Sequence, residues 1–120
     1  IYVCSPSNPE GSVLKLKEWK NLISLARNYD GALIVDECYT DIYVKTRPLG
    51  ILEACKKLKT GLTNIISFQS LSKRSNVPGI RSGFAVGDKY LIQNFKNLET
   101  LVAPEPRCQW SLVEVHRLSF

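Results

Sequence analysis

The residue types that could carry out covalent chemistry gather in residues 67–87, which read SFQSLSKRSNVPGIRSGFAVG. Lys73 lies in a serine-rich turn with Ser70 and Ser72, and Arg81 follows a Pro-Gly bend. A lysine amine becomes a nucleophile when desolvation or a nearby cation lowers its pKa, and the neighbouring arginines are candidates for that cation. Hydroxyl groups and an arginine around a lysine also suit a phosphate group. The segment therefore predicts a reactive lysine beside an anion site.

The runs on either side of this segment have the composition of buried strands. Residues 64–68 and 84–86 are rich in β-branched and aromatic side chains, so Lys73 is expected on a loop at the mouth of a strand. The plain alternative is a solvated lysine, which is the usual state of a lysine in a serine-rich loop. A lysine that forms a Schiff base beside a phosphate site suggests instead pyridoxal phosphate, the cofactor whose aldehyde such a lysine binds.

The string SLSKRSNVPGIRSGF resembles the lysine segment of fold-type I, pyridoxal-phosphate-dependent aminotransferases of class I/II. It is most similar to their succinyldiaminopimelate aminotransferase branch, in which S-K-R-S-N-x-P-G-x-R-x-G-F recurs. The resemblance implies that Lys73 is the Schiff-base lysine and the catalytic base. It also implies that Ser70, Ser72 and Arg81 bind the cofactor phosphate.

A second motif follows the first apolar run. Residues 6–12 (PSNPEGS) are dense in turn formers, and Asn8 precedes Pro9, which favours an extended backbone and leaves the Asn8 amide free. A turn asparagine without a further role is the plain alternative. The pattern S-x-x-N-P-x-G resembles the asparagine loop of the same aminotransferases, although Glu10 replaces the common threonine. The resemblance implies that Asn8 bonds the phenolic oxygen of the cofactor.

A third motif ends the apolar run of residues 32–35, where the chain reads Asp36-Glu37-Cys38-Tyr39. A carboxylate at the carboxyl end of a buried parallel strand lies where open α/β sheets place their ligands, although a helix cap or a partner for a base is the plain alternative. The motif resembles the D-E-x-Y of these aminotransferases. The resemblance implies that Asp36 pairs with the protonated pyridine nitrogen of the cofactor, which keeps the ring an electron sink. Tyr39 is expected to bond the phenolic oxygen, and no role is predicted for Glu37 or Cys38.

The remaining segments predict the helices and turns that position these motifs. Ser12 is expected to cap a helix that ends at Asp30-Gly31, residues 51–59 form a short helix with a basic end, and Asp88 caps a helix running to about Leu101. The first of these helices has an apolar face that packs against a sheet, made of Leu16, Trp19, Ile23 and Ala26. The two glycines of the lysine motif, Gly79 and Gly83, are expected to be required by the backbone.

These elements predict an α/β fold, part of the mostly parallel, helix-flanked sheet of the aminotransferase large domain, which binds the cofactor. Residues 1–102 are expected to be its central part. From residue 103 the resemblance stops, and residues 103–120 are expected to be a divergent tail, for which a shifted reading frame or disorder would account. The chain contains no methionine and is expected to begin inside a longer natural sequence.

The composition of the chain argues against several other classes of protein. The 120 residues are 44% hydrophobic and 22% charged, as in ordinary soluble domains, and the net charge of +5 comes from scattered lysines. This favours a solvated surface over a nucleic-acid interface. No run suits a membrane span and no signal peptide is visible. The cysteines form no C-x-x-C pair and His116 is the one histidine, so no metal site is expected and a cytoplasmic location is the default.

The sequence thus predicts a fragment of an aminotransferase that moves an amino group between an amino acid and a 2-oxo acid, with succinyldiaminopimelate of lysine biosynthesis as the candidate substrate. The family acts as homodimers, and no nucleic-acid or membrane partner is expected. The isolated chain is expected to be inactive, because the upstream phosphate loop and the downstream small domain of the family have no counterpart in it. Two alternatives stay open: a catalytically inactive remnant, and, less favoured, a small basic module that binds phosphates of nucleic acid.

Overall fold

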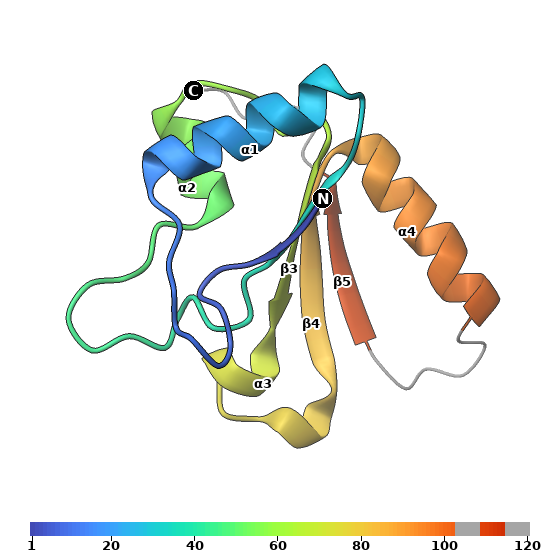
Figure 1. The fold of residues 1–120 in the computed structure, drawn as a ribbon. Coiled ribbons are helices and arrows are strands. Elements are labelled where there is room, and N and C mark those ends of the chain that lie inside the picture. Colours follow the sequence, from blue (N-terminus) through green and yellow to red (C-terminus); the bar gives the residue numbers. More distant parts are fainter. Residues whose placement is uncertain (103–108, 115–120) are drawn as a thin grey trace.

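The computed structural model describes residues 1–102 and 109–114 of the chain. One five-stranded sheet organises these residues (Figure 1), and its strands lie side by side in chain order. The strands are β1 (Tyr2–Cys4), β2 (Leu33–Asp36), β3 (Ile65–Ser70), β4 (Ser82–Gly87) and β5 (Gln109–Glu114). The first three strands run parallel, β4 runs antiparallel to β3, and β5 runs parallel to β4. The predicted α/β class with a mostly parallel sheet is confirmed.

Helices cover both faces of this sheet. They are α1 (Leu16–Asn28), α2 (Ile51–Lys57), the one-turn α3 (Leu71–Arg74), the 3-10 turn η1 (Pro78–Ile80) and α4 (Lys89–Val102). Figure 1 shows α1 and α2 together on one side of the sheet and α4 on the other. In the part of the chain that the structure describes, no helix is long and apolar enough to cross a membrane.

The alternation of side chains along the strands divides the core into two layers. Leu33, Val35 and Ile65 point toward α1 and α2 and belong to the larger buried cluster. Ile66 of β3 belongs to the smaller cluster on the α4 side, which also contains Ala85 and Ile92. Strands covered on both faces need near-continuous apolar sequence, which explains the apolar run of residues 32–35.

The first helix confirms one prediction and corrects another. Trp19 is fully buried in the larger cluster, and its indole N–H donates to the Leu49 carbonyl at 2.9 Å. Ser12, however, is not the helix cap. Its hydroxyl pairs with that of Ser7 at 2.6 Å, and the helix begins after Lys15, whose N–H donates to the Glu18 carboxylate at 2.7 Å. An acidic residue in the first turn has taken the place of a serine cap.

The predicted boundaries near the lysine segment also need correction. Lys73 lies in the short helix α3, and not on an irregular loop. Gly79 has no left-handed backbone, and a Cβ placed on it would meet nothing within 4 Å, so no backbone requirement for glycine exists there. The Asp88 cap is confirmed, because its carboxylate accepts from the Tyr90 N–H at 2.7 Å.

The predicted tail contains a strand that the sequence did not indicate. Strand β5 pairs with β4 from Ser82↔Gln109 to Gly87↔Glu114. Disorder, one of the two explanations offered for a divergent tail, therefore does not apply to residues 109–114, and the divergence of the tail stays a prediction. Residues 103–108 and 115–120 lie outside the described part of the chain, so the domain boundary at residue 102 stays a prediction.

Candidate functional site

Two of the predicted site residues meet at the carboxyl ends of β1 and β2. The side-chain amide of Asn8 donates to the Tyr39 hydroxyl at 3.0 Å. Asn8 lies on the loop after β1 and Tyr39 on the loop after β2, and parallel strands bring these two loops to the same edge of the sheet. The Ser5 N–H, which donates to the Asp36 carbonyl at 3.1 Å, extends the pairing of the strands into the first loop.

Lys73 reaches the same place from the third parallel strand. It lies in α3, directly after β3, and its ammonium group is 5.9 Å from the centroid of the Tyr39 ring. This distance is within the range of a cation–π contact. Three motifs that are far apart in sequence therefore converge at one edge of the sheet, with Tyr39 in contact with both Asn8 and Lys73.

Asp36 ends β2 at this edge, and both of its carboxylate oxygens accept hydrogen bonds. The Cys38 N–H donates to Oδ1 and the Tyr2 hydroxyl donates to Oδ2, each at 3.0 Å. The hydrogen bond to Asp36 is the main cause that raises the pKa of Tyr2 to about 12. Burial, followed by the Asp36 carboxylate, raises the pKa of the Cys38 thiol to about 12, and the same two causes raise the pKa of Cys4. Each of these three groups is therefore neutral near pH 7.

The three residues predicted to hold a phosphate lie around α3. The Ser70 hydroxyl accepts from the Ser72 N–H at 3.1 Å and caps the helix. Ser70 pairs with Gly83 of β4, and Arg81 lies directly before the first residue of that strand. Arg81 has a left-handed backbone (φ 52°), and its guanidinium donates to the Pro78 carbonyl of its own turn at 3.3 Å. A left-handed non-glycine residue is uncommon and is often found at functional sites.

Glu37, like Cys38, is a residue of this region for which the sequence predicted no role. It is 2% exposed, and its carboxylate accepts from the Ile51 N–H at 2.8 Å, the Ser67 hydroxyl at 2.6 Å and the Gln69 amide at 3.4 Å. Burial is the largest influence on it and raises the pKa of Glu37, while these donors act in the opposite direction. The alternation of strand side chains could have found it, because Glu37 falls on the same face as buried Val35, where a carboxylate requires donors.

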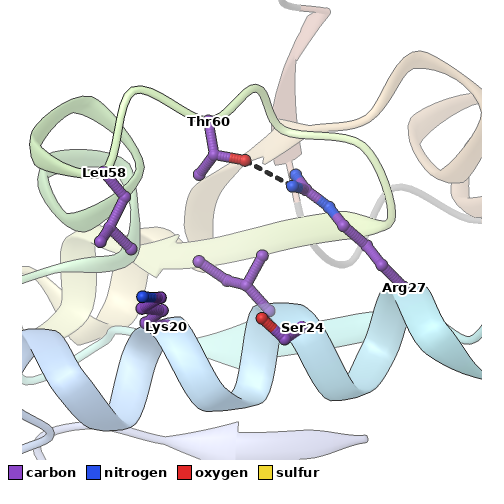
Figure 2. Close-up of a pocket in the computed structure, with 6 residues that line it drawn as sticks. Lys20, Ser24, Arg27, Leu58 and Thr60 are labelled. Carbon is purple, nitrogen blue, oxygen red and sulfur yellow. Dashed lines mark hydrogen bonds between the residues drawn. The ribbon is translucent and has the colours of Figure 1, made fainter.

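A surface pocket of about 190 Å³ is separate from this region. It lies between α1 and the loop after α2, at the end of β3 opposite to Ser70 (Figure 2). Figure 2 shows Arg27 reaching across to Thr60, to whose hydroxyl it donates a hydrogen bond. The Arg27 guanidinium also donates to the Gly61 carbonyl at 2.7 Å. Arg27 therefore ties α1 to the start of β3.

Comparisons with known proteins give the family of the chain. The family model for aminotransferase class I and II matches residues 1–111. A transaminase of Streptomyces rimosus, 4-dedimethylamino-4-oxo-anhydrotetracycline transaminase OxyQ, is 39% identical over 77% of this chain and 25% of its own length. Among solved structures, an aminotransferase of Neisseria meningitidis is 47% identical with a TM-score of 0.78, covering 85% of this chain and 26% of that one. The aminotransferase AspB of Helicobacter pylori is 41% identical with a TM-score of 0.77, covering 85% of this chain and 28% of that one. The chain thus spans about a quarter of the length of these proteins, and it belongs to the class I and II aminotransferase family.

Proposed function

We propose that this chain forms the cofactor-binding centre of a pyridoxal-phosphate-dependent aminotransferase. The observation that carries the proposal is the meeting of Asn8, Tyr39 and Lys73 at the carboxyl ends of three adjacent parallel strands. Family membership supplies the chemical context, and the donor set fits the cofactor: an amine for an aldehyde, a phenol and an amide for a phenolic oxygen, and a carboxylate for a ring nitrogen.

Lys73 is the residue that would bind the aldehyde of pyridoxal phosphate. When bound, this cofactor supplies the electron sink that stabilises a carbanion of the amino-acid substrate. The Lys73 amine would also be the base that takes the proton from the α-carbon of the amino-acid substrate. Its exposure on the short helix α3 leaves the ammonium group accessible to a small molecule.

The other residues would bind and orient the cofactor. Asp36 would hold a proton on the ring nitrogen, since an adjacent anion favours the cationic form of a base. Asn8 and Tyr39, already hydrogen-bonded to each other, would share the phenolic oxygen. The phosphate would be held by Ser70, Ser72 and Arg81, of which the guanidinium offers charge-assisted hydrogen bonds.

The reactants in this proposal are an amino acid and a 2-oxo acid. We favour succinyldiaminopimelate as the substrate on the basis of the lysine-segment motif. A protein of Thermus thermophilus described as a probable N-succinyldiaminopimelate aminotransferase is 25% identical to this chain, with a TM-score of 0.72. Other relatives are named histidinol-phosphate aminotransferase and LL-diaminopimelate aminotransferase, each 33% identical. We place the whole protein in the cytoplasm, the default for its cysteine content, and expect a homodimer, as the family resemblance implies.

The proposal is favoured over a nucleic-acid-binding module by the pairing of the basic residues. Arg74 lies 3.4 Å from the Asp41 carboxylate, and Arg47 lies 3.0 Å from the same carboxylate. The Asp41 carboxylate offsets part of the charge of these two guanidinium groups, which leaves less positive charge to bind a phosphate backbone. An inactive remnant that has lost cofactor binding is the alternative that experiment must exclude.

Reductive trapping with pyridoxal phosphate and borohydride, followed by peptide mapping, tests the proposal. We expect the label to be concentrated at Lys73 and abolished there in Lys73→Ala. The exposed Lys20 and Lys57 on the far helices serve as internal controls, because neither lies near Tyr39. Label spread evenly over the surface lysines would mean that the chain has no cofactor site.

A further inference from the structure

Tyr2 contacts Asp36 across two parallel strands. In the register of β1 and β2, Tyr2 is opposite Ile34 and Cys4 is opposite Asp36. Tyr2 and Asp36 are therefore diagonal neighbours on one face of the sheet, a separation that a long aromatic side chain can span. The Tyr2 hydroxyl donates to Oδ2 of Asp36 at 3.0 Å.

Packing does not account for this arrangement. The Tyr2 side chain is 66% exposed, so burial of its ring contributes little, and its hydroxyl is the part that the fold engages. A hydrogen bond to a carboxylate is stronger than one between neutral groups. Because the Cys38 N–H occupies Oδ1 at 3.0 Å, Tyr2 completes the fixation of both carboxylate oxygens.

The protonation of Tyr2 fits the role of a permanent donor. The hydrogen bond to Asp36, then burial, then the Asp36 charge raise the pKa of Tyr2 to about 12. The other titratable groups close to Asp36 are Cys4 and Cys38, and the pKa of each thiol is raised as well. The phenol therefore keeps its proton throughout the neutral range and remains a hydrogen-bond donor to Asp36.

We propose that Tyr2 is a positioning residue for Asp36, whose carboxylate it holds in place for contact with the ring nitrogen of pyridoxal phosphate. The inference rests on the proposed function and extends it to a residue outside the three motifs. A carboxylate oxygen has two lone pairs, so Oδ2 can accept from Tyr2 and from a protonated ring nitrogen together. Donors on both oxygens restrict the rotation of the carboxylate, so a ring nitrogen would meet it in one orientation.

The test uses the whole chain loaded with pyridoxal phosphate that carries ¹⁵N in the ring, because the ¹⁵N chemical shift reports whether that nitrogen is protonated. The variants are Tyr2→Phe, Asp36→Asn and, as matched control, Tyr29→Phe, which alters a phenol that is 81% exposed after the end of α1. We expect the parent and Tyr29→Phe to hold a protonated ring and Asp36→Asn an unprotonated one. Tyr2→Phe should lower the proton affinity of the ring nitrogen by about tenfold, one pH unit in its midpoint.

A second measurement needs no cofactor. With ¹³C at the phenolic carbon of tyrosine, the Tyr2 signal is identified by its loss in Tyr2→Phe, and its pKa should fall from about 12 toward 10.0 in Asp36→Asn. Cofactor binding should lower the same pKa in the parent chain, since a ring cation next to Asp36 offsets the charge that holds the phenol proton.

The outcomes separate the inference from the function on which it rests. If the parent chain binds no cofactor, or if Asp36→Asn leaves the ring protonated, the proposed function fails and the inference fails with it. If Asp36→Asn removes the proton and Tyr2→Phe matches the parent, the proposed function stands and the role of Tyr2 is wrong. If the pKa of Tyr2 is the same in the parent chain and in Asp36→Asn, Tyr2 does not donate a hydrogen bond to Asp36, and the proposed role of Tyr2 is wrong.

Discussion

The hydroxyl of Ser67 lies 2.6 Å from the Glu37 carboxylate, and both side chains are buried. The same carboxylate accepts the N–H of Ile51, the first residue of α2, at 2.8 Å. One side chain thus joins the loop after β2, the strand β3 and the start of α2. Because Asp36 precedes Glu37 and Lys73 follows β3, this junction lies beneath the candidate site and fixes the two segments that supply it.

We predict that Glu37→Ala destabilises the fold more than Glu37→Gln. Alanine leaves the Ile51 N–H and the Ser67 hydroxyl buried without an acceptor, and each such group costs about 1–3 kcal/mol. Glutamine keeps one acceptor for Ile51 and retains the volume. Urea unfolding followed by circular dichroism gives both free energies. Equal losses in the two variants would show that the acceptor and the volume that glutamine keeps contribute nothing to stability.

Glu37 also predicts a pH dependence of stability. Burial raises the pKa of Glu37 above its usual 4.5, so the folded chain binds more protons than the unfolded chain in the interval above pH 4.5. The contribution of Glu37 is fully present below pH 4.5 and is lost as pH rises through the folded-state pKa. Glutamine does not titrate, so as pH rises above 4.5 the free energy of unfolding of Glu37→Gln should increase relative to that of the parent. A constant difference between the two chains would contradict the raised pKa.

Gly50 lies against the same carboxylate. A Cβ at Gly50 would lie 2.7 Å from Oε1 of Glu37, whereas a Cβ at Gly61 would meet nothing within 4 Å. We predict that Gly50→Ala destabilises the chain by about 1–3 kcal/mol, as overpacking of a core does. Gly61→Ala is the matched control and should be neutral or stabilising by up to about 1 kcal/mol. The double variant Gly50→Ala/Glu37→Ala has no clash, because the carboxylate is absent. Its loss of unfolding free energy should therefore be smaller than the sum of the losses of the two single variants. A loss equal to that sum would contradict the contact.

Cys38 provides a chemical test of the environment of Asp36. Burial and the Asp36 carboxylate raise the pKa of Cys38 to about 12, so the thiol should react slowly with iodoacetamide at pH 8. Asp36→Asn removes the second of these causes, and the thiolate fraction should rise about tenfold for each unit by which the pKa falls. Cys55, whose pKa is raised to about 11 mainly by burial in the core, is the internal control and should not change. An unchanged rate at Cys38 would place its thiol outside the influence of Asp36.

The sequence predicted the parts of the fold that depend on local pattern. The apolar run of residues 32–35 is a strand because it is buried on both faces, and the spacing of Trp19 and Ile23 predicted a helix with one buried face. The prediction failed where partners are distant. Strand β5 is held by pairing with β4, and the residues of the tail do not indicate that pairing. The Ser12 cap failed for a local reason, because the helix begins only after Lys15 and the Ser12 hydroxyl pairs with that of Ser7.

The candidate site shows the same division. The motifs identified Asn8, Tyr39 and Lys73, and the parallel order of the strands explains why these residues meet. Their supports, Tyr2 and Glu37, depend on strand register and on a buried face. A motif contains neither kind of information. It gives the residue types along the chain, but not which residues become neighbours on adjacent strands of the sheet.

The last prediction is that these 120 residues by themselves do not catalyse transamination. A transaminase must hold the carboxylate of its substrate as well as the cofactor, and an arginine is the side chain best suited to do so. Of the four arginines in the described residues, three bond other parts of the fold, and Arg81 is the one assigned to the cofactor phosphate. Arg27 bonds Thr60 and Gly61, Arg47 and Arg74 share Asp41, and Arg81 bonds Pro78.

Without a carboxylate clamp the reaction loses positioning, which in favourable cases lowers a barrier by roughly 7–11 kcal/mol. The chain also spans only 25% of the length of its relative from Streptomyces rimosus, so three quarters of that protein have no counterpart in the comparison. The measurement is a half-reaction, in which the chain is mixed with pyridoxal phosphate and glutamate and the formation of pyridoxamine phosphate is followed. We expect the rate to equal that of Lys73→Ala and of free cofactor. A rate clearly above both controls would show that Lys73, Asp36, Asn8 and Tyr39 suffice for catalysis, and that one of the engaged arginines releases its partner to bind the substrate.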